Sequence, residues 1–258
     1  MTEKFIDITG RVAVVVGGTS GLGRAIALGL AQAGAKVVPT GRRTELVASV
    51  CAEIEKLGGE TVRCAVDVAA RESIDELREA VMKRFGRVDI LVNAAGRTAR
   101  TPTAKVGEDE WAAIMDTNLT GMLRACQSFY EPLKRSGRGR IINIASLSSF
   151  VAFHEVAAYG ASKAGVLALT KSLGAEWARD RISVNAIAPG VFRTALNEKL
   201  LDETERGREL LMRTPMRRFG RPEELIGASI FLASDAVSFI TGQTITVDGG
   251  FLASGVNS

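Results

Sequence analysis

The sequence predicts an α/β fold: a single domain built on a doubly wound parallel sheet with helices on both faces. Two observations support this fold class. Short runs of apolar and β-branched residues alternate with longer amphipathic stretches, the order expected of strand–helix repeats with right-handed crossovers. The first run, Val12-Ala13-Val14-Val15-Val16, is apolar at every position, as in a strand that is buried on both faces of a parallel sheet.

The composition is that of one globular domain. The chain has 258 residues, a length at which one large α/β domain is the default, and its 46% hydrophobic content is enough for a substantial core. No linker, low-complexity segment or domain break interrupts it. We therefore expect residues 1–258 to form one domain.

The other elements follow from the same alternation of patterns. The first strand is followed by a helix that ends near residue 33. Further strands are expected at 36–40, 61–66, 90–93, 141–145, 183–188 and 244–247. Further helices are expected at 44–57, 73–85, 108–133, 156–179 and 222–232. Residues 191–218 form a variable stretch that receives no assignment.

A glycine-rich turn follows the first strand. It reads Gly17-Gly18-Thr19-Ser20-Gly21-Leu22-Gly23, with the glycines spaced G-x-x-x-G-x-G, and it leads into a helix. Glycine lets the backbone approach a pyrophosphate, whose charge the helix N-terminus then meets. A purely structural turn has the same composition, but the position between a strand and an amphipathic helix favours a Rossmann-like nucleotide-binding fold.

Two arginines stand at the end of the second predicted strand. Dinucleotide sites that take NAD place a carboxylate there to bind the ribose hydroxyls, whereas this chain has Thr40-Gly41-Arg42-Arg43. Guanidinium groups suit a 2′-phosphate better than a neutral diol. Arg42 and Arg43 therefore favour NADP over NAD, the alternative being that they are solvated charges at a helix start.

A serine, a tyrosine and a lysine follow at spacings that suit carbonyl chemistry. Ser146 comes directly after the apolar run at 141–145, while Tyr159 and Lys163 are four residues apart and share one face of a predicted helix. A phenol has an ordinary pKa of about 10, and a neighbouring ammonium group favours its ionised form. Tyr159 is thus a candidate general acid or base, and Ser146 a candidate donor to a substrate carbonyl oxygen, unless the spacing is accidental.

With these residues in view, the chain resembles the short-chain dehydrogenases/reductases over essentially its full length. Asn93-Ala94-Ala95-Gly96 is similar to the family's Asn-Asn-Ala-Gly segment, although Ala94 replaces one asparagine and Val16 replaces the usual threonine before the glycine turn. Asn118 matches the asparagine that holds a proton-relay water. The resemblance implies a catalytic tetrad of Asn118, Ser146, Tyr159 and Lys163.

The resemblance also implies the cofactor contacts. In this family the adenine ring lies against the pair matched by Asp67 and Val68, and the nicotinamide beside the segment of Pro189, Gly190 and Thr194. The implied cofactor residues are Gly17, Thr19, Ser20, Gly21, Leu22, Gly23, Arg42, Arg43, Asp67, Val68, Asn93, Ala94, Ala95, Gly96, Tyr159, Lys163, Pro189, Gly190 and Thr194. The implied reaction is hydride transfer between NADP and a carbonyl or secondary alcohol, with Tyr159 exchanging the proton and Lys163 lowering its pKa and holding the ribose.

Substrate specificity is expected from three variable pieces, 97–105, 147–158 and 191–218. In the first piece Arg97 or Arg100 is a candidate partner for a substrate carboxylate, and in the second His154 and Glu155 are candidate contacts for hydroxyls. Features such as Arg100, Trp177 and the segment 247–251 resemble gluconate 5-dehydrogenases and related enzymes, which favours a sugar acid or polyol.

Two other functions stay open. A 3-oxoacyl-[acyl-carrier-protein] reductase docks an acidic carrier on basic residues, for which Arg135, Arg138 and Arg179 are available, although acidic residues interrupt the patch. A binding module that senses NADP without catalysis would share the cofactor site, but it has no need of both Tyr159 and Lys163.

The composition argues against several other partners. The net charge of +4 is modest and the basic residues are scattered, so no nucleic-acid interface is expected. One histidine and three widely spaced cysteines predict neither a metal site nor disulfides, and no apolar run predicts a membrane span, so we expect a cytoplasmic protein. A stripe of small residues on the 156–179 helix, together with the family resemblance, predicts a homotetramer.

Overall fold

A six-stranded parallel sheet forms the centre of the protein, in a computed structural model that describes residues 6–194 and 197–255. The strands lie in the order β2-β1-β3-β4-β5-β6, and every pairing between them is parallel. They are β1 (Val12–Val16), β2 (Lys36–Thr40), β3 (Ile90–Asn93), β4 (Gly139–Ile144), β5 (Ile182–Pro189) and β6 (Thr244–Val247). The chain winds outward in both directions from β1, so the predicted doubly wound fold class is confirmed.

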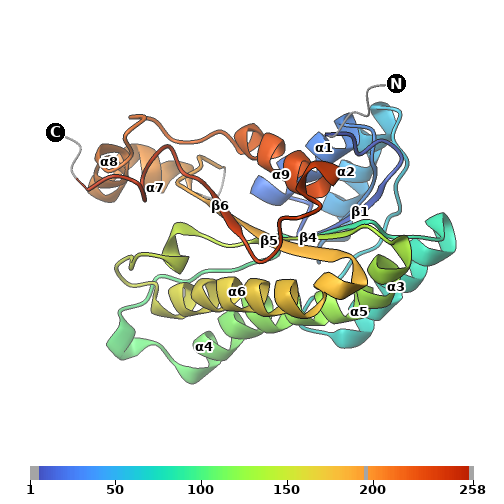
Figure 1. Ribbon diagram of the computed structural model, residues 1–258. Helices are drawn as coiled ribbons and strands as arrows, with labels where there is room; N and C mark the ends of the chain where they lie inside the picture. The colour runs from blue at the N-terminus through green and yellow to red at the C-terminus, as the bar shows by residue number, and fades with distance from the viewer. Residues whose placement is uncertain (1–5, 195–196, 256–258) are drawn as a thin grey trace.

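Helices cover both faces of the sheet (Figure 1). On one face lie α1 (Gly21–Gln32), α2 (Thr44–Lys56) and α9 (Ile226–Ala233). On the other lie α3 (Arg71–Phe85), α4 (Glu108–Met115), α5 (Gly121–Ser136) and α6 (Ala157–Glu176). Two short helices, α7 (Glu198–Glu203) and α8 (Glu205–Met212), lie beyond the carboxyl ends of the strands. Single helical turns occur at Thr103–Lys105, Asp116–Thr120, Leu147–Ser149, Ala178–Asp180, Pro222–Leu225 and Asp235–Val237.

The core has two halves because successive side chains of a strand point to opposite faces. Val12, Val14 and Val16 of β1 pack with the apolar residues of α3, α5 and α6. Ala13 and Val15 of the same strand pack with those of α1, α2 and α9. The unbroken apolar run of β1 therefore reflects burial on both sides of the sheet, as its sequence predicted.

The predicted strand at 61–66 is wrong. This segment runs beside β2, where the Val37 amide donates to Glu60 O over 3.1 Å and the Val66 amide donates to Gly41 O over 2.9 Å, but no ladder joins these two bonds. Pro39 of β2 has no N–H group with which to continue the pairing. The segment consequently covers the edge of the sheet without becoming a strand.

Two further stretches add detail to the prediction. The helices expected around 108–133 are α4 and α5, with a π-helical turn, Asp116–Thr120, between them. The variable stretch 191–218 contains α7 and α8, while its residues 195 and 196 lie outside the described part of the chain. Both stretches lie next to the carboxyl edge of the sheet, where ligands bind in open α/β folds.

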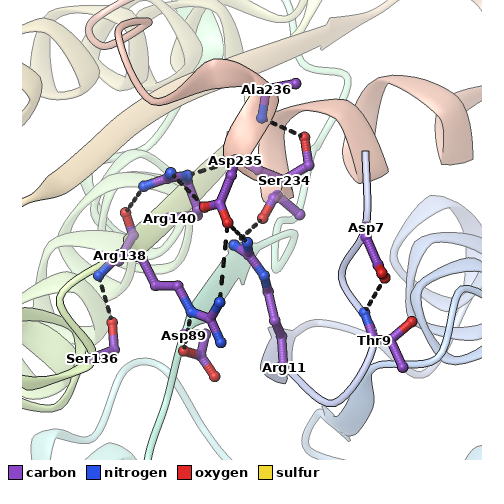
Figure 2. Close-up of polar contacts among 12 residues, drawn as sticks. Asp7, Thr9, Arg11, Asp89, Ser136, Arg138, Arg140, Ser234, Asp235 and Ala236 are labelled. Atoms are coloured by element: carbon purple, nitrogen blue, oxygen red, sulfur yellow. Dashed lines mark hydrogen bonds and ion pairs between the residues drawn. The ribbon is translucent and has the colours of Figure 1, made fainter. Parts of the chain in front are cut away.

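Ion pairs close the opposite, amino edge of the sheet (Figure 2). The half-exposed carboxylate of Asp235 pairs with two buried arginines, Arg11 and Arg140. Arg138 reaches the fully buried Asp89 through Nε over 3.4 Å and lies 4.0 Å from Asp235 through Nη1. These contacts fasten the amino ends of three strands to the turn after α9, remote from the carboxyl edge.

Candidate active site

A cleft of about 920 Å³ opens along the carboxyl edge of the sheet. Its walls come from the β1–α1 turn, from the carboxyl ends of β2, β3, β4 and β5, from the start of α6 and from α7 and α8. This is the point where the strand order reverses at β1, the usual ligand site of a doubly wound sheet.

The glycine turn is shaped for a close backbone approach. A Cβ atom on Gly17 would lie 2.4 Å from the amide nitrogen of Ala95, and one on Gly23 would lie 2.1 Å from Gly17 O. Gly17 and Gly21 also have φ angles of +82° and +51°, which favour glycine. Helix α1 begins within this turn, at Gly21, with no side-chain cap and no acidic residue in its first turn, so its N-terminal N–H groups can meet phosphate. The glycine turn and the start of α1 therefore fit the pyrophosphate of a dinucleotide.

The two arginines predicted to select NADP line the cleft. Arg42 and Arg43 follow β2, and both side chains are exposed at the same end of the cleft as Asp67 and Val68. No described carboxylate lies within ion-pair distance of either guanidinium group. Their charge is therefore available to a phosphate on the adenine-side ribose.

The three side chains predicted to be catalytic converge on the cleft. Ser146 follows β4, and its hydroxyl forms a hydrogen bond with Tyr159, which lies in the first turn of α6. Lys163, one turn further along α6, is almost completely buried and donates from Nζ to Ile144 O over 2.7 Å. Its Nζ lies 5.7 Å from the centre of the Tyr159 ring. The three side chains thus meet as their spacing predicted.

The pKa values of Tyr159 and Lys163 both shift toward the neutral forms. Burial raises the pKa of Tyr159, and the hydrogen bond with Ser146 only partly opposes it. Burial lowers the pKa of Lys163 to about 8. The expected lowering of the tyrosine pKa by Lys163 is not found, because desolvation dominates and the lysine nitrogen is bound to a main-chain carbonyl. The protein alone therefore keeps Tyr159 as a phenol, a form that can donate a proton.

Asn118 supports the loop after β3 that lines the cleft. It lies in the π-helical turn, is fully buried, and does not line the cleft. Its Oδ1 accepts from the Arg97 amide over 2.8 Å, while Nδ2 donates to Arg97 O over 2.9 Å and to Ser162 Oγ over 3.0 Å. The side chain therefore joins the loop after β3 to α6, and its predicted water-holding role stays a prediction.

Asn93 is also placed in the core. Its Nδ2 donates to Asn143 Oδ1 over 2.9 Å and to Cys126 Sγ over 3.3 Å, whereas Oδ1 is buried without a partner. The side chain does not line the cleft, unlike Ala94, Ala95 and Gly96 after it. Its predicted contact with the cofactor stays a prediction, and the observed contacts hold β3 to β4. The other predicted cofactor residues all line the cleft: Gly17, Thr19, Ser20, Gly21, Leu22, Gly23, Arg42, Arg43, Asp67, Val68, Ala94, Ala95, Gly96, Tyr159, Lys163, Pro189, Gly190 and Thr194.

Of the four predicted substrate residues, Arg97 lines the cleft, whereas Arg100, His154 and Glu155 do not. Arg100 forms an ion pair with Glu155, with Nε 2.6 Å from Oε2, and His154 has a side chain that is 83% exposed. The charges of Arg100 and Glu155 thus serve to join two loops. The guanidinium-bearing residues that do line the substrate end are Arg97, which the sequence offered beside Arg100 as a partner for a substrate carboxylate, and Arg206, which it did not single out. The only signal for Arg206 was its position in the variable stretch 191–218.

No cluster of metal-ligand residues and no membrane-spanning helix occurs in the described parts of the chain. Groups of three or more histidine, cysteine, aspartate or glutamate side chains suited to a metal ion are absent from residues 6–194 and 197–255. None of the helices described there is both long and apolar enough to cross a membrane.

The chain is similar over its length to known oxidoreductases. The family model described as enoyl-(acyl carrier protein) reductase matches residues 16–252. A 2-dehydro-3-deoxy-D-gluconate 5-dehydrogenase from Escherichia coli K12 is 39% identical, with 98% of this chain and 100% of that protein covered. A 3-oxoacyl-[acyl-carrier-protein] reductase from Synechocystis sp. is 38% identical, with 95% and 98% covered. The structure of a gluconate 5-dehydrogenase from Burkholderia cenocepacia J2315 in complex with NADP and tartrate has a TM-score of 0.93 and 38% identity, covering 97% of this chain and 98% of that one.

Proposed function

The chain belongs to the short-chain dehydrogenase/reductase family of NAD(P)-dependent oxidoreductases, and we propose that it moves a hydride between NADP and a sugar acid or polyol. One observation carries the reaction: Ser146, Tyr159 and Lys163 meet in the same cleft as the glycine turn. The groups that bind a dinucleotide and the groups that exchange a proton with a carbonyl oxygen thus lie in one continuous space.

In the direction of reduction, the protein supplies the proton and positions the carbonyl group. Bound NADPH supplies the hydride. Ser146 binds the carbonyl oxygen, and the Tyr159 hydroxyl donates its proton to that oxygen as negative charge develops there. Burial keeps Tyr159 protonated, which suits this direction, since oxidation requires the phenolate. Lys163 in its charged form stabilises the phenolate left after proton transfer.

NADP is the cofactor that the cleft fits best. Arg42 and Arg43 stand at the end of β2, where a site for NAD carries a carboxylate. The related gluconate 5-dehydrogenase from Burkholderia cenocepacia holds NADP. These two observations support NADP for this chain.

The charge of the cleft supports an acidic substrate. Arg97 and Arg206 line its substrate end, while Asp67, at the adenine end, is the one acidic residue among the described residues that line it. A cleft of one sign concentrates ligands of the opposite charge. A carboxylate on the substrate therefore fits this cleft, and a sugar acid has one.

The competing function is reduction of 3-oxoacyl groups on a carrier protein, since a reductase of that class is about as similar to the chain as the sugar-acid enzyme. The basic residues available for docking the carrier do not favour it. Arg135 is in the last turn of α5 and Arg179 follows α6, so both lie at the amino edge of the sheet, opposite to the cleft of the same chain. Arg138 is engaged with Asp89.

A substrate panel separates these functions. We expect NADPH oxidation with 5-keto-D-gluconate or another keto-sugar acid, and much weaker activity with a 3-oxoacyl thioester. The reverse preference would replace the sugar-acid proposal with the carrier-protein one. NADP binding without turnover of any carbonyl compound would favour the sensing module.

Assembly and location are part of the same proposal. The outer face of α6 exposes small residues, which suits close packing between subunits of a homotetramer; they are Ala161, Ala164, Ala168, Ser172 and Ala175. The three cysteines are free thiols, which fits a reducing cytoplasm.

A further inference from the structure

Arg206 is a charged residue of the cleft whose charge is not balanced by a carboxylate. It lies on α8, is partly buried, and lines the cleft together with the apolar side chains of Leu201 and Leu210. Its one described polar contact runs from Nη1 to His154 O over 3.2 Å. No carboxylate of the described residues lies within ion-pair distance of it.

Several arginines outside the cleft are paired with carboxylates. Arg193 binds Asp202 and Glu198, and Arg218 binds Glu224 through two parallel hydrogen bonds of 2.7 Å. Arg100 binds Glu155, the residue after the His154 that Arg206 contacts. The protein thus supplies acidic partners for several guanidinium groups outside the cleft but no described one for Arg206.

The chemistry of the guanidinium group points to its ligand. Arginine offers five N–H donors in a planar fork, and a single carbonyl oxygen satisfies only one of them. Partial burial beside apolar side chains strengthens the attraction for an anion, because less water screens it. A carboxylate matches the fork with two parallel hydrogen bonds.

The position of Arg206 suits a substrate group distant from the reacting carbon. The His154 carbonyl that it contacts belongs to the loop leading into α6, five residues before Tyr159. The contact therefore holds α8 against the loop that places the catalytic tyrosine. A ligand spanning the cleft from Tyr159 toward α8 would present its far end to Arg206.

We propose that Arg206 binds the substrate carboxylate and is the residue that selects a sugar acid over a neutral ketose. The inference rests on the proposed oxidoreductase function, which it deepens by assigning the acid-recognising residue. The sequence had predicted this role for Arg100, but the charge of Arg100 is neutralised by the ion pair with Glu155.

The test compares two substrates that differ only in the group assigned to Arg206. In 5-keto-D-gluconate C1 is a carboxylate, and in L-sorbose the corresponding carbon is a CH₂OH group. The readout is the ratio of kcat/KM for the acid to kcat/KM for the sugar at saturating NADPH. We expect Arg206→Gln to lower this ratio by about 10- to 100-fold, the range of a charge-assisted hydrogen-bond pair, with the loss mainly in the KM of the acid. Arg206→Lys is expected to restore part of it.

Two further variants control for charge and for location. Arg208→Gln removes the same charge from an exposed position of α8 that does not line the cleft, and it is expected to change the ratio by less than about twofold. Arg97→Gln removes the other arginine of the substrate end. A ratio that falls with Arg97→Gln or Arg208→Gln but not with Arg206→Gln would overturn the assignment, as would equal losses for both substrates in Arg206→Gln.

A binding measurement separates this inference from the proposed reaction. Calorimetry gives the affinity of the NADP-loaded protein for D-gluconate and for the neutral D-glucitol. A preference for gluconate that Arg206→Gln abolishes supports the inference even if no keto acid is turned over, in which case only the proposed reaction fails. Turnover of the keto acid with constants that Arg206→Gln does not change refutes the inference and leaves the reaction in place. Neither binding nor turnover of an acid refutes both.

Discussion

Replacement of Lys163 by methionine tests the electrostatics of the site. Lys163 is almost completely buried, and burial alone lowers its pKa from 10.5 to about 8. The folded protein therefore holds the lysine proton less tightly than the unfolded chain does. Between pH 8 and 10.5 the unfolded chain binds more protons than the folded one, so the stability of the wild type rises with pH across this window.

The size of the effect follows from the two pKa values. A lowering from 10.5 to about 8 corresponds to about 3 kcal/mol of unfolding free energy at about 1.4 kcal/mol per pKa unit. Lys163→Met has no proton to exchange at this position. The stability of the wild type relative to Lys163→Met is therefore expected to increase by about 2 to 3 kcal/mol as the pH rises from 7 to 10.

Urea denaturation of the cofactor-free proteins, at equal concentration and in the presence of a reductant, measures this difference. Other titrating groups are the same in both proteins, so their contributions cancel. Lys171, exposed on the same helix, provides the matched control Lys171→Met, which replaces a lysine without removing a buried charge. The expectation is refuted if the stability difference between the wild type and Lys163→Met is the same at pH 7 and pH 10. It is also refuted if that difference changes with pH in the same way as the difference between the wild type and Lys171→Met.

Three further predictions concern the cofactor, the scaffold and the assembly. Replacing Arg42 and Arg43 by serine is expected to raise the KM for NADPH by at least about tenfold and to leave that for NADH nearly unchanged; equal losses for both would contradict a contact with the 2′-phosphate. Asp89→Asn removes the charge that binds Arg87 and Arg138 and is expected to lower the free energy of unfolding by about 1 to 3 kcal/mol in urea denaturation, with kcat little affected, because the residue lies at the far edge of the sheet. Sedimentation at micromolar concentration is expected to give a tetramer, and a single 27.4 kDa species would rule it out.

Local patterns predicted the centre of the site. The glycine turn works through backbone conformation and close packing, and the four-residue spacing of Tyr159 and Lys163 follows from helix geometry. Both are properties of adjacent residues, which a sequence displays directly. The long apolar runs likewise identified the buried strands of the parallel sheet.

Contacts between distant segments were not predictable. The segment 61–66 has the composition of a strand, yet it fails to pair because Pro39, more than twenty residues earlier, lacks a donor. Arg100 and Glu155 are 55 positions apart and neutralise each other, which withdraws both from the list of substrate contacts. The direction in which the pKa of Tyr159 shifts depends on burial, and the spacing of residues along the sequence does not reveal burial.

The most direct test of the central claim is NADPH oxidation by the wild type and by Tyr159→Phe, measured with a keto-sugar acid alongside the dissociation constant of NADPH for each protein. We expect the variant to bind NADPH nearly as tightly as the wild type and to lose at least about 100-fold in kcat, the rate factor that a positioned proton donor contributes. Equal kcat values in the two proteins would show that Tyr159 does not donate the proton and would contradict the mechanism.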